Sequence, residues 1–113
     1  MHVEALPTWP HEDRPTAGSF EGAEHGSGVS FFVVDAALGR GPKLHRHPYS
    51  ETFLLQSGRG RFQLGDGAVE AGPGEVVVVP PETPHKFTSL GPEHLRLVAI
   101  HDTPRFETLW LED

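Results

Sequence analysis

The chain has 113 residues, no cysteine and a formal net charge of −7. This length fits one domain, the negative charge argues against nucleic acid as a partner, and the lack of cysteine excludes a disulfide framework, a thiolate nucleophile and a cysteine-ligated zinc. No apolar run approaches the roughly 20 residues that cross a bilayer. The first residues lack the basic start and apolar core of a secretory leader, so we expect none. We therefore expect a cytoplasmic protein that does not associate with membranes.

Residues 1–27 contain few aliphatic side chains and many prolines and glycines. This composition predicts an extended N-terminal arm with little structure of its own. Trp9 and Phe20 are its expected anchors onto the folded body or onto a partner subunit. Residues 28–113 are then expected to form a single β-barrel domain.

From residue 29 onward, short β-branched and aromatic runs alternate with glycine and proline, which predicts strands joined by turns. Seven strands are expected, over residues 29–36, 51–56, 61–64, 68–71, 75–79, 86–88 and 95–100. This spacing is typical of an all-β sandwich or barrel. The continuous apolar runs at 31–34 and 76–79 predict that both faces of those strands are covered. Only residues 106–112 are compatible with a short helical turn.

Three histidines and one glutamate form the most informative pattern of the sequence. His45 and His47 alternate along an extended segment, so that both imidazoles point to one side. Glu51 has the same parity, although Pro48 lies between them, and His85 follows in a later segment. Three imidazoles and one carboxylate suit one divalent transition metal, with Fe, Mn, Ni, Co and Zn as the candidates.

These residues resemble the two sequence motifs of a small single-domain cupin. The first motif is present in full, at Gly39, His45, His47, Glu51 and Gly58. The second motif is present at Gly74, Pro80 and His85. Glu82 stands where this motif usually has glycine, which predicts a turn of different shape. Ser89 stands where it usually has asparagine, which predicts the loss of a side-chain hydrogen bond beside His85.

The resemblance implies a jelly-roll barrel, also called a double-stranded β-helix. His85 would come from a non-adjacent strand, so that the metal would join the two halves of the barrel. Gly39 and Gly58 would allow turns where a Cβ atom would clash. Phe53 and Phe87 would form an apolar collar that excludes water from the metal.

Three further residues are candidates for contacts around the metal or with a substrate, namely His101, Tyr49 and Gln63. The other histidines are expected at the surface, namely His2, His11, His25 and His94. Loss of metal binding, with the same histidines acting as hydrogen-bonding groups in the pocket, is the alternative interpretation of the cluster.

The resemblance implies a metal-dependent enzyme of the dioxygenase, decarboxylase, isomerase or lyase type, acting on a small polar organic molecule inside the barrel. The alternative is a non-catalytic module that binds or senses a small ligand, and a structural or storage protein is the weakest interpretation. We also expect a homodimer, formed through a sheet face or an exchanged N-terminal strand.

Overall fold

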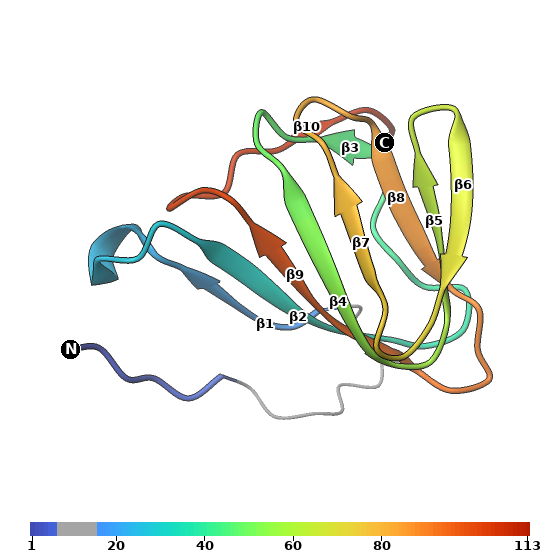
Figure 1. The fold of residues 1–113 in the computed structure, drawn as a ribbon, viewed down its shortest axis with the longest axis horizontal. Coiled ribbons are helices and arrows are strands. Elements are labelled where there is room, and N and C mark those ends of the chain that lie inside the picture. The colour runs from blue at the N-terminus through green and yellow to red at the C-terminus, as the bar shows by residue number, and fades with distance from the viewer. Residues whose placement is uncertain (7–15) are drawn as a thin grey trace.

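The computed structural model describes residues 1–6 and 16–113, which contain two five-stranded antiparallel sheets facing each other. The first sheet has the strand order β1-β2-β9-β4-β7 and the second has the order β10-β3-β8-β5-β6 (Figure 1). The strands of the first sheet are β1 (Thr16–Glu21), β2 (Ser30–Ala36), β9 (Leu95–His101), β4 (Glu51–Ser57) and β7 (Val76–Val79). Those of the second are β10 (Leu109–Trp110), β3 (His45–Arg46), β8 (His85–Ser89), β5 (Gly60–Leu64) and β6 (Gly67–Ala71).

The core lies between the two sheets. It forms because inward-facing and outward-facing side chains alternate along the strands. Along β9, Leu95, Leu97 and Ala99 point inward and are buried, while the residues between them are only half-buried. The rings of Phe53 and Phe87 meet edge to face in the core, with centroids 5.6 Å apart. The predicted all-β jelly-roll class is confirmed, and all seven predicted strands are present with ends shifted by no more than one residue.

Helical structure is confined to one short 3-10 helix, η1 (Ala23–His25), in the part of the chain that the structure describes. No helix there is long and apolar enough to cross a bilayer, and the cytoplasmic location stays a prediction. The helical turn expected at 106–112 is wrong, because this segment contains β10, which pairs with β3. The free edge of β3 offers backbone hydrogen bonds, such as Leu111 N–H to the Leu44 carbonyl at 2.9 Å, that outweigh local preference.

The N-terminal region has more structure than its composition suggests. β1 lies inside the predicted arm and pairs antiparallel with β2, so the expectation of little structure is wrong for Thr16–Glu21. Phe20 stacks on Phe31 with ring centroids 5.2 Å apart, which confirms that it anchors this region to the body. Trp9 and His11 lie outside the described residues.

The expectation that both faces of the two apolar runs are covered holds for one run and is wrong for the other. In β2, Val33 and Val34 point to opposite faces and both are buried. In β7, Val76 and Val78 point outward and are 56% and 55% exposed. The two strands differ in position, because β7 is an edge strand of its sheet, whereas β2 lies between β1 and β9.

Candidate metal centre

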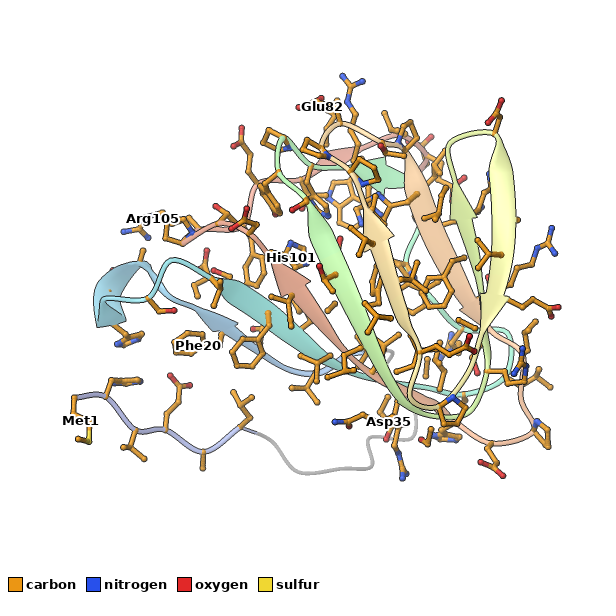
Figure 2. All side chains as sticks on the ribbon, viewed as in Figure 1. Met1, Phe20, Asp35, Glu82, His101 and Arg105 are labelled. Atoms are coloured by element: carbon orange, nitrogen blue, oxygen red, sulfur yellow. The ribbon has the colours of Figure 1, made fainter. Side chains whose placement is uncertain are left out.

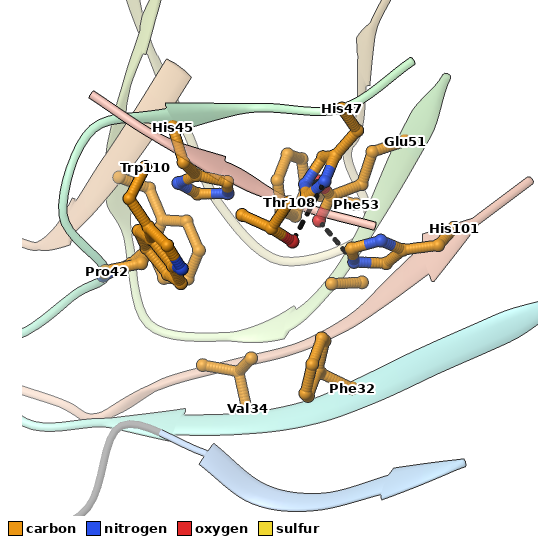
Figure 3. A pocket seen from close by; sticks show the side chains of 12 residues that line it. Phe32, Val34, Pro42, His45, His47, Glu51, Phe53, His101, Thr108 and Trp110 are labelled. Carbon is orange, nitrogen blue, oxygen red and sulfur yellow. Dashed lines mark hydrogen bonds and ion pairs between the residues drawn. The ribbon is translucent and has the colours of Figure 1, made fainter. Parts of the chain in front are cut away.

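Four side chains of the predicted set meet inside one end of the barrel. We call His45, His47, Glu51 and His85 the buried cluster, because their ligand atoms all lie within 4.8 Å of one another and none of the four residues is more than 7% exposed. Figure 3 shows His45, His47 and Glu51 projecting into a common space from their strands and connecting segments. The structure therefore brings together the residues that the sequence pattern singled out.

The two sheets contribute unequally to this cluster. β3 and β8 are hydrogen-bonded neighbours, and His45 lies directly opposite His85. The expectation that His85 comes from a strand not adjacent to the first two histidines is therefore wrong. Glu51 begins β4 in the other sheet and is the residue that connects the two halves of the barrel.

Backbone carbonyl groups fix the tautomer of all three cluster imidazoles. Each Nδ1 lies within hydrogen-bond distance of one carbonyl oxygen, with His45 at 2.7 Å from Lys43, His47 at 2.9 Å from Glu107 and His85 at 2.8 Å from Thr83. A carbonyl can only accept, so each Nδ1 carries the proton and donates it. In the neutral rings this leaves the Nε2 lone pairs free to coordinate.

The free lone pairs converge on one carboxylate oxygen. Nε2 of His47 and Nε2 of His85 lie 3.1 Å and 3.0 Å from Glu51 Oε1. In a neutral ring this nitrogen and the carboxylate oxygen are both acceptors, so the contact is unfavourable unless a proton or a cation lies between them. Within the described residues, Nε2 of His47 has no hydrogen-bond partner. A divalent cation satisfies all of these atoms at once, so the donor set fits a metal.

Burial sets the charge of these groups at neutral pH. Desolvation, assisted by repulsion from His85 and His47, lowers the pKa of His45 from 6.5 to about 4, so this ring is neutral. Burial alone would raise the pKa of Glu51, but hydrogen bonding at the carboxylate, led by His101, holds it well below its usual value. A neutral imidazole and an ionised carboxylate are the forms that bind metals.

His101 and Tyr49 lie at the cluster, as predicted, and connect two of its members. His101 Nε2 lies 3.2 Å from Glu51 Oε2, the carboxylate oxygen that faces away from His47 and His85. The Tyr49 hydroxyl lies 2.8 Å from His101 Nδ1 and 3.2 Å from His47 Nδ1. This network holds the Glu51 carboxylate in one orientation, with Oε1 toward the cluster.

Gln63, the third candidate, does not lie at the cluster. Along β5 the side chains alternate, and Phe62 occupies the inward position and is fully buried. Gln63 therefore points to the outer face of its sheet and is exposed.

The C-terminal segment supplies a wall of the site that no motif indicated. Phe106 stacks on Phe32 at 4.3 Å between ring centroids and meets the edge of His101 at 4.9 Å. The carbonyl of Glu107 accepts the His47 hydrogen bond, and Thr108 lines the cavity beside that ring (Figure 3). Backbone carbonyl atoms leave no trace in a sequence, so only the aromatic residues near the C-terminus could have indicated this wall.

The two departures from the second motif have different outcomes. Glu82 adopts the left-handed conformation, with φ of 64°, that glycine would adopt there, so the expectation of a differently shaped turn is wrong. Its N–H donates to the His47 carbonyl at 2.7 Å, and its carboxylate lies 3.5 Å from Arg46. The hydroxyl of Ser89 is buried with no hydrogen-bond partner among the described residues, in agreement with the expected loss.

The two glycines of the first motif are required for different reasons. At Gly58, with φ of 73°, an added Cβ would lie 2.4 Å from the carbonyl oxygen of His94, which confirms the expected clash. At Gly39 nothing described lies within 4 Å of such an atom, so the clash expected there is wrong. Its φ of 81° is the constraint instead.

A cavity of about 270 Å³ adjoins the buried cluster. Phe53 and Phe87, the expected apolar collar, line it together with ten other residues, namely Phe32, Val34, Pro42, His45, His47, Glu51, Ala99, His101, Thr108 and Trp110. Figure 3 shows Phe32 and Val34 on one side of the cavity and Trp110 beside Pro42 at another. The arrangement offers room for a small molecule next to the cluster.

Several solved structures share this fold. An uncharacterized conserved protein with a double-stranded β-helix domain from Klebsiella pneumoniae superposes with a TM-score of 0.77 at 20% identity, covering 93% of this chain and 90% of that one. The oxalate decarboxylase of Lactobacillus farciminis gives 0.77 at 20% identity, covering 91% of this chain and 33% of that one. The oxalate decarboxylase of Bacillus subtilis, a protein with Mn(II) centres, gives 0.78 at 19% identity, covering 92% of this chain and 30% of that one.

Sequence comparison gives the family. An uncharacterized protein of Methanocaldococcus jannaschii is 31% identical over 80 residues, which is 68% of this chain. The matched part spans 64% of the length of that relative. The model of the cupin domain, Cupin_2, matches residues 32–101, which include every member of the buried cluster. The chain belongs to the Cupin_2 family.

Proposed function

We propose that this cupin domain binds one divalent transition metal through the buried cluster, with Fe, Mn, Ni, Co and Zn as the candidates, and acts as a metal-dependent enzyme on a small organic molecule. The observation that carries the proposal is the contact between Glu51 Oε1 and the Nε2 atoms of His47 and His85. These are acceptor atoms at hydrogen-bond distance, in rings whose only proton is donated elsewhere. The Mn(II) centres of the B. subtilis protein of the same fold support the proposal.

When bound, a divalent ion of this kind supplies Lewis-acid activation of a carbonyl or carboxylate group. The side chains of the chain hold and shield the site. Carbonyl groups orient the three imidazoles, Glu51 offsets one unit of positive charge, and His101 orients the carboxylate. Phe53 and Phe87 exclude water from the inner wall. Dioxygenase, decarboxylase, isomerase and lyase reactions are all compatible with this arrangement.

Activity assays with defined metals test the proposal. The purified protein is loaded separately with Fe(II), Mn(II), Ni(II) and Co(II), and metal content is measured. O2 uptake and substrate loss are then followed against a panel of diketones, thiols and phenols. We expect turnover with at least one metal and none for His85→Ala. A protein that retains metal but consumes no substrate with any of the four ions contradicts the enzymatic part of the proposal.

One feature favours the alternative, a module that binds or senses a small ligand without turnover. Two titratable groups beside the cluster, His101 and Tyr49, are hydrogen-bonded to each other, and His101 also contacts Glu51. Neither is therefore free to transfer a proton to a substrate in this arrangement. Tight ligand binding by the metal-loaded protein with no chemical change in the ligand would select this alternative.

We also propose that the protein forms a homodimer through the outer face of the first sheet. Val76 and Val78 on the edge strand are more than half exposed, and Leu54 lies directly opposite Val76 on β4 and is 40% exposed. Exposed apolar side chains on a sheet edge favour pairing with another surface. Light scattering during size-exclusion chromatography should give a dimer, and Val78→Lys should shift it toward the monomer. A monomeric wild-type protein contradicts this proposal.

A further inference from the structure

The cavity beside the buried cluster has an apolar body and only one polar end. Its walls are formed mainly by Phe32, Val34, Phe53, Phe87, Ala99 and Trp110. Its volume of about 270 Å³ corresponds to about nine molecules of liquid water. Among the described residues that line it there is no lysine and no arginine. A ligand in this cavity therefore meets no lysine or arginine side chain.

The formal charge of a loaded site follows from the cluster itself. A divalent ion and the ionised Glu51 together carry +2 − 1 = +1, because imidazoles bind metals in their neutral form. A monoanionic ligand brings this sum to zero. A dianionic ligand leaves a net charge of −1 within apolar walls, and an uncompensated charge in such surroundings is strongly unfavourable.

The polar groups beside the cluster are hydrogen-bonded to one another. His101 can accept the Tyr49 hydroxyl proton at Nδ1, over 2.8 Å, and donate Nε2–H to Glu51 Oε2, over 3.2 Å. The Tyr49 oxygen in turn accepts the Glu107 N–H at 3.3 Å. These contacts tie His101 and Tyr49 to the protein.

Trp110 gives the cavity an aromatic wall at its mouth. Its ring lies 5.0 Å from the ring of His45 between centroids, and the residue is 58% exposed. A flat ligand whose donor atoms reach the metal would pass beside this indole. Aromatic side chains bind flat apolar bodies through stacking and through the burial of large apolar areas.

On the basis of the proposed metal site, we infer that the ligand of this cavity is a monoanion with a flat apolar body. A small dianionic dicarboxylate such as oxalate, the substrate that names two of the proteins of the same fold, fits this cavity poorly. The inference concerns the class of ligand and is independent of the reaction that follows binding.

Binding to the Zn(II)-loaded protein tests the inference without any activity assay. Tropolone is the probe for the monoanionic class and oxalate is the dianionic competitor. Both are titrated by calorimetry and by Trp fluorescence, with Trp110→Phe used to assign the fluorescence change, and metal content is measured after each titration. We expect tropolone to bind more than about tenfold more tightly than oxalate.

A positive charge introduced at the mouth of the cavity makes the test more specific. Trp110→Lys removes the aromatic wall and adds a cation, so tropolone affinity should fall and oxalate affinity should rise, each by about tenfold. Leu109→Lys adds the same charge one residue away, at a half-exposed position that does not line the cavity. It should leave both affinities nearly unchanged.

The titrations have different outcomes for failure of the ligand inference and for failure of the proposed metal site. A wild-type protein that retains Zn(II) and binds oxalate as tightly as tropolone overturns the inference and leaves the metal site intact. Equal effects of Trp110→Lys and Leu109→Lys on the ratio of the two affinities also overturn it. A protein that loads no metal contradicts the proposed function first, and the inference with it.

Discussion

Two groups of histidines and glutamates in this molecule have similar composition and opposite character. The buried cluster contains three histidines and Glu51, and a second group, the exposed cluster, contains His2, Glu4 and His25. In both, one potential ligand atom of each residue lies within 4.8 Å of the others. Figure 2 shows the N-terminal segment beside Phe20, whereas His101 points into the barrel interior. Proximity of suitable residue types is thus common to both groups.

The difference lies in what holds the side chains. In the buried cluster each imidazole donates Nδ1–H to a carbonyl oxygen, which directs Nε2 to the centre. In the exposed cluster His2 and His25 are stacked face to face, 3.6 Å apart between centroids. Among the described residues no backbone carbonyl accepts a hydrogen bond from either of these rings. Fixed tautomers and burial, more than residue type, distinguish a prepared metal site from a group of neighbours.

The largest expected effect comes from removing one ligand in each cluster. His85→Ala should lower metal affinity by at least about a hundredfold, because one of four ligands carries a large share of the 10–16 kcal/mol typical of a structural metal site. His25→Ala should change it by less than about twofold. Competition titrations with a chromogenic chelator measure both. Equal losses in the two variants would remove the distinction between the clusters.

Glu51→Gln tests the charge in the buried cluster while keeping its size and one potential oxygen ligand. We expect metal affinity to fall by about tenfold to a hundredfold, since the amide does not offset the charge of the ion. Glu4→Gln is the matched control in the exposed cluster and should have no measurable effect. Unchanged affinity in Glu51→Gln would contradict the assignment of this carboxylate as a ligand.

The stability of the metal-free protein should fall in acid. Burial lowers the pKa of His45 from 6.5 to about 4, so between these values the unfolded ring binds a proton that the folded ring does not. The lowered pKa of Glu51 acts in the same direction at lower pH. The free energy of unfolding should therefore decrease from about pH 6.5 to about pH 4 by up to about 1.4 kcal/mol per pH unit from His45, and Glu51 should add to the decrease only below about pH 4.5.

Urea denaturation at pH 7 and at pH 5 measures this decrease. His45→Gln should remove part of it, because a neutral side chain does not titrate. His2→Gln, an exposed position, should leave the slope unchanged. A wild-type protein that is equally stable at both pH values would show that His45 is not held in its neutral form.

The smallest effect is expected for Tyr49→Phe, which removes only the hydroxyl that connects His101 and His47. Hydrogen bonds that orient ligands contribute about tenfold to a hundredfold to metal affinity, and His47 keeps its bond to the Glu107 carbonyl. We expect a loss of about tenfold or less in the competition titration. A loss as large as that of His85→Ala would mean that Tyr49 is itself a ligand.

The sequence was sufficient to predict the members of the buried cluster and the strands that carry most of them. Alternation along an extended segment brings His45 and His47 to one side, and the paired motifs connect them with Glu51 and His85. The outward direction of Gln63 could not be predicted from the sequence. It follows from the buried position of Phe62, and a strand of five residues does not reveal which of its two faces is buried.

What the sequence could not provide are the contacts made by the backbone and by the chain ends. The carbonyl of Glu107 orients His47 from a segment 60 residues away, and a carbonyl has no residue preference. β10 has only two residues, and it forms because β3 has a free edge. Pairing of this kind depends on tertiary arrangement, which local propensity does not encode.

A crystal grown with a divalent transition metal and measured at its absorption edge tests the central claim most directly. An anomalous-difference map should contain one strong peak about 2.0–2.3 Å from Nε2 of His45, His47 and His85 and from Glu51 Oε1. The position between His2 and His25 should remain without a peak. A strong peak at the exposed cluster alone, or four buried side chains with no peak among them, would contradict the account.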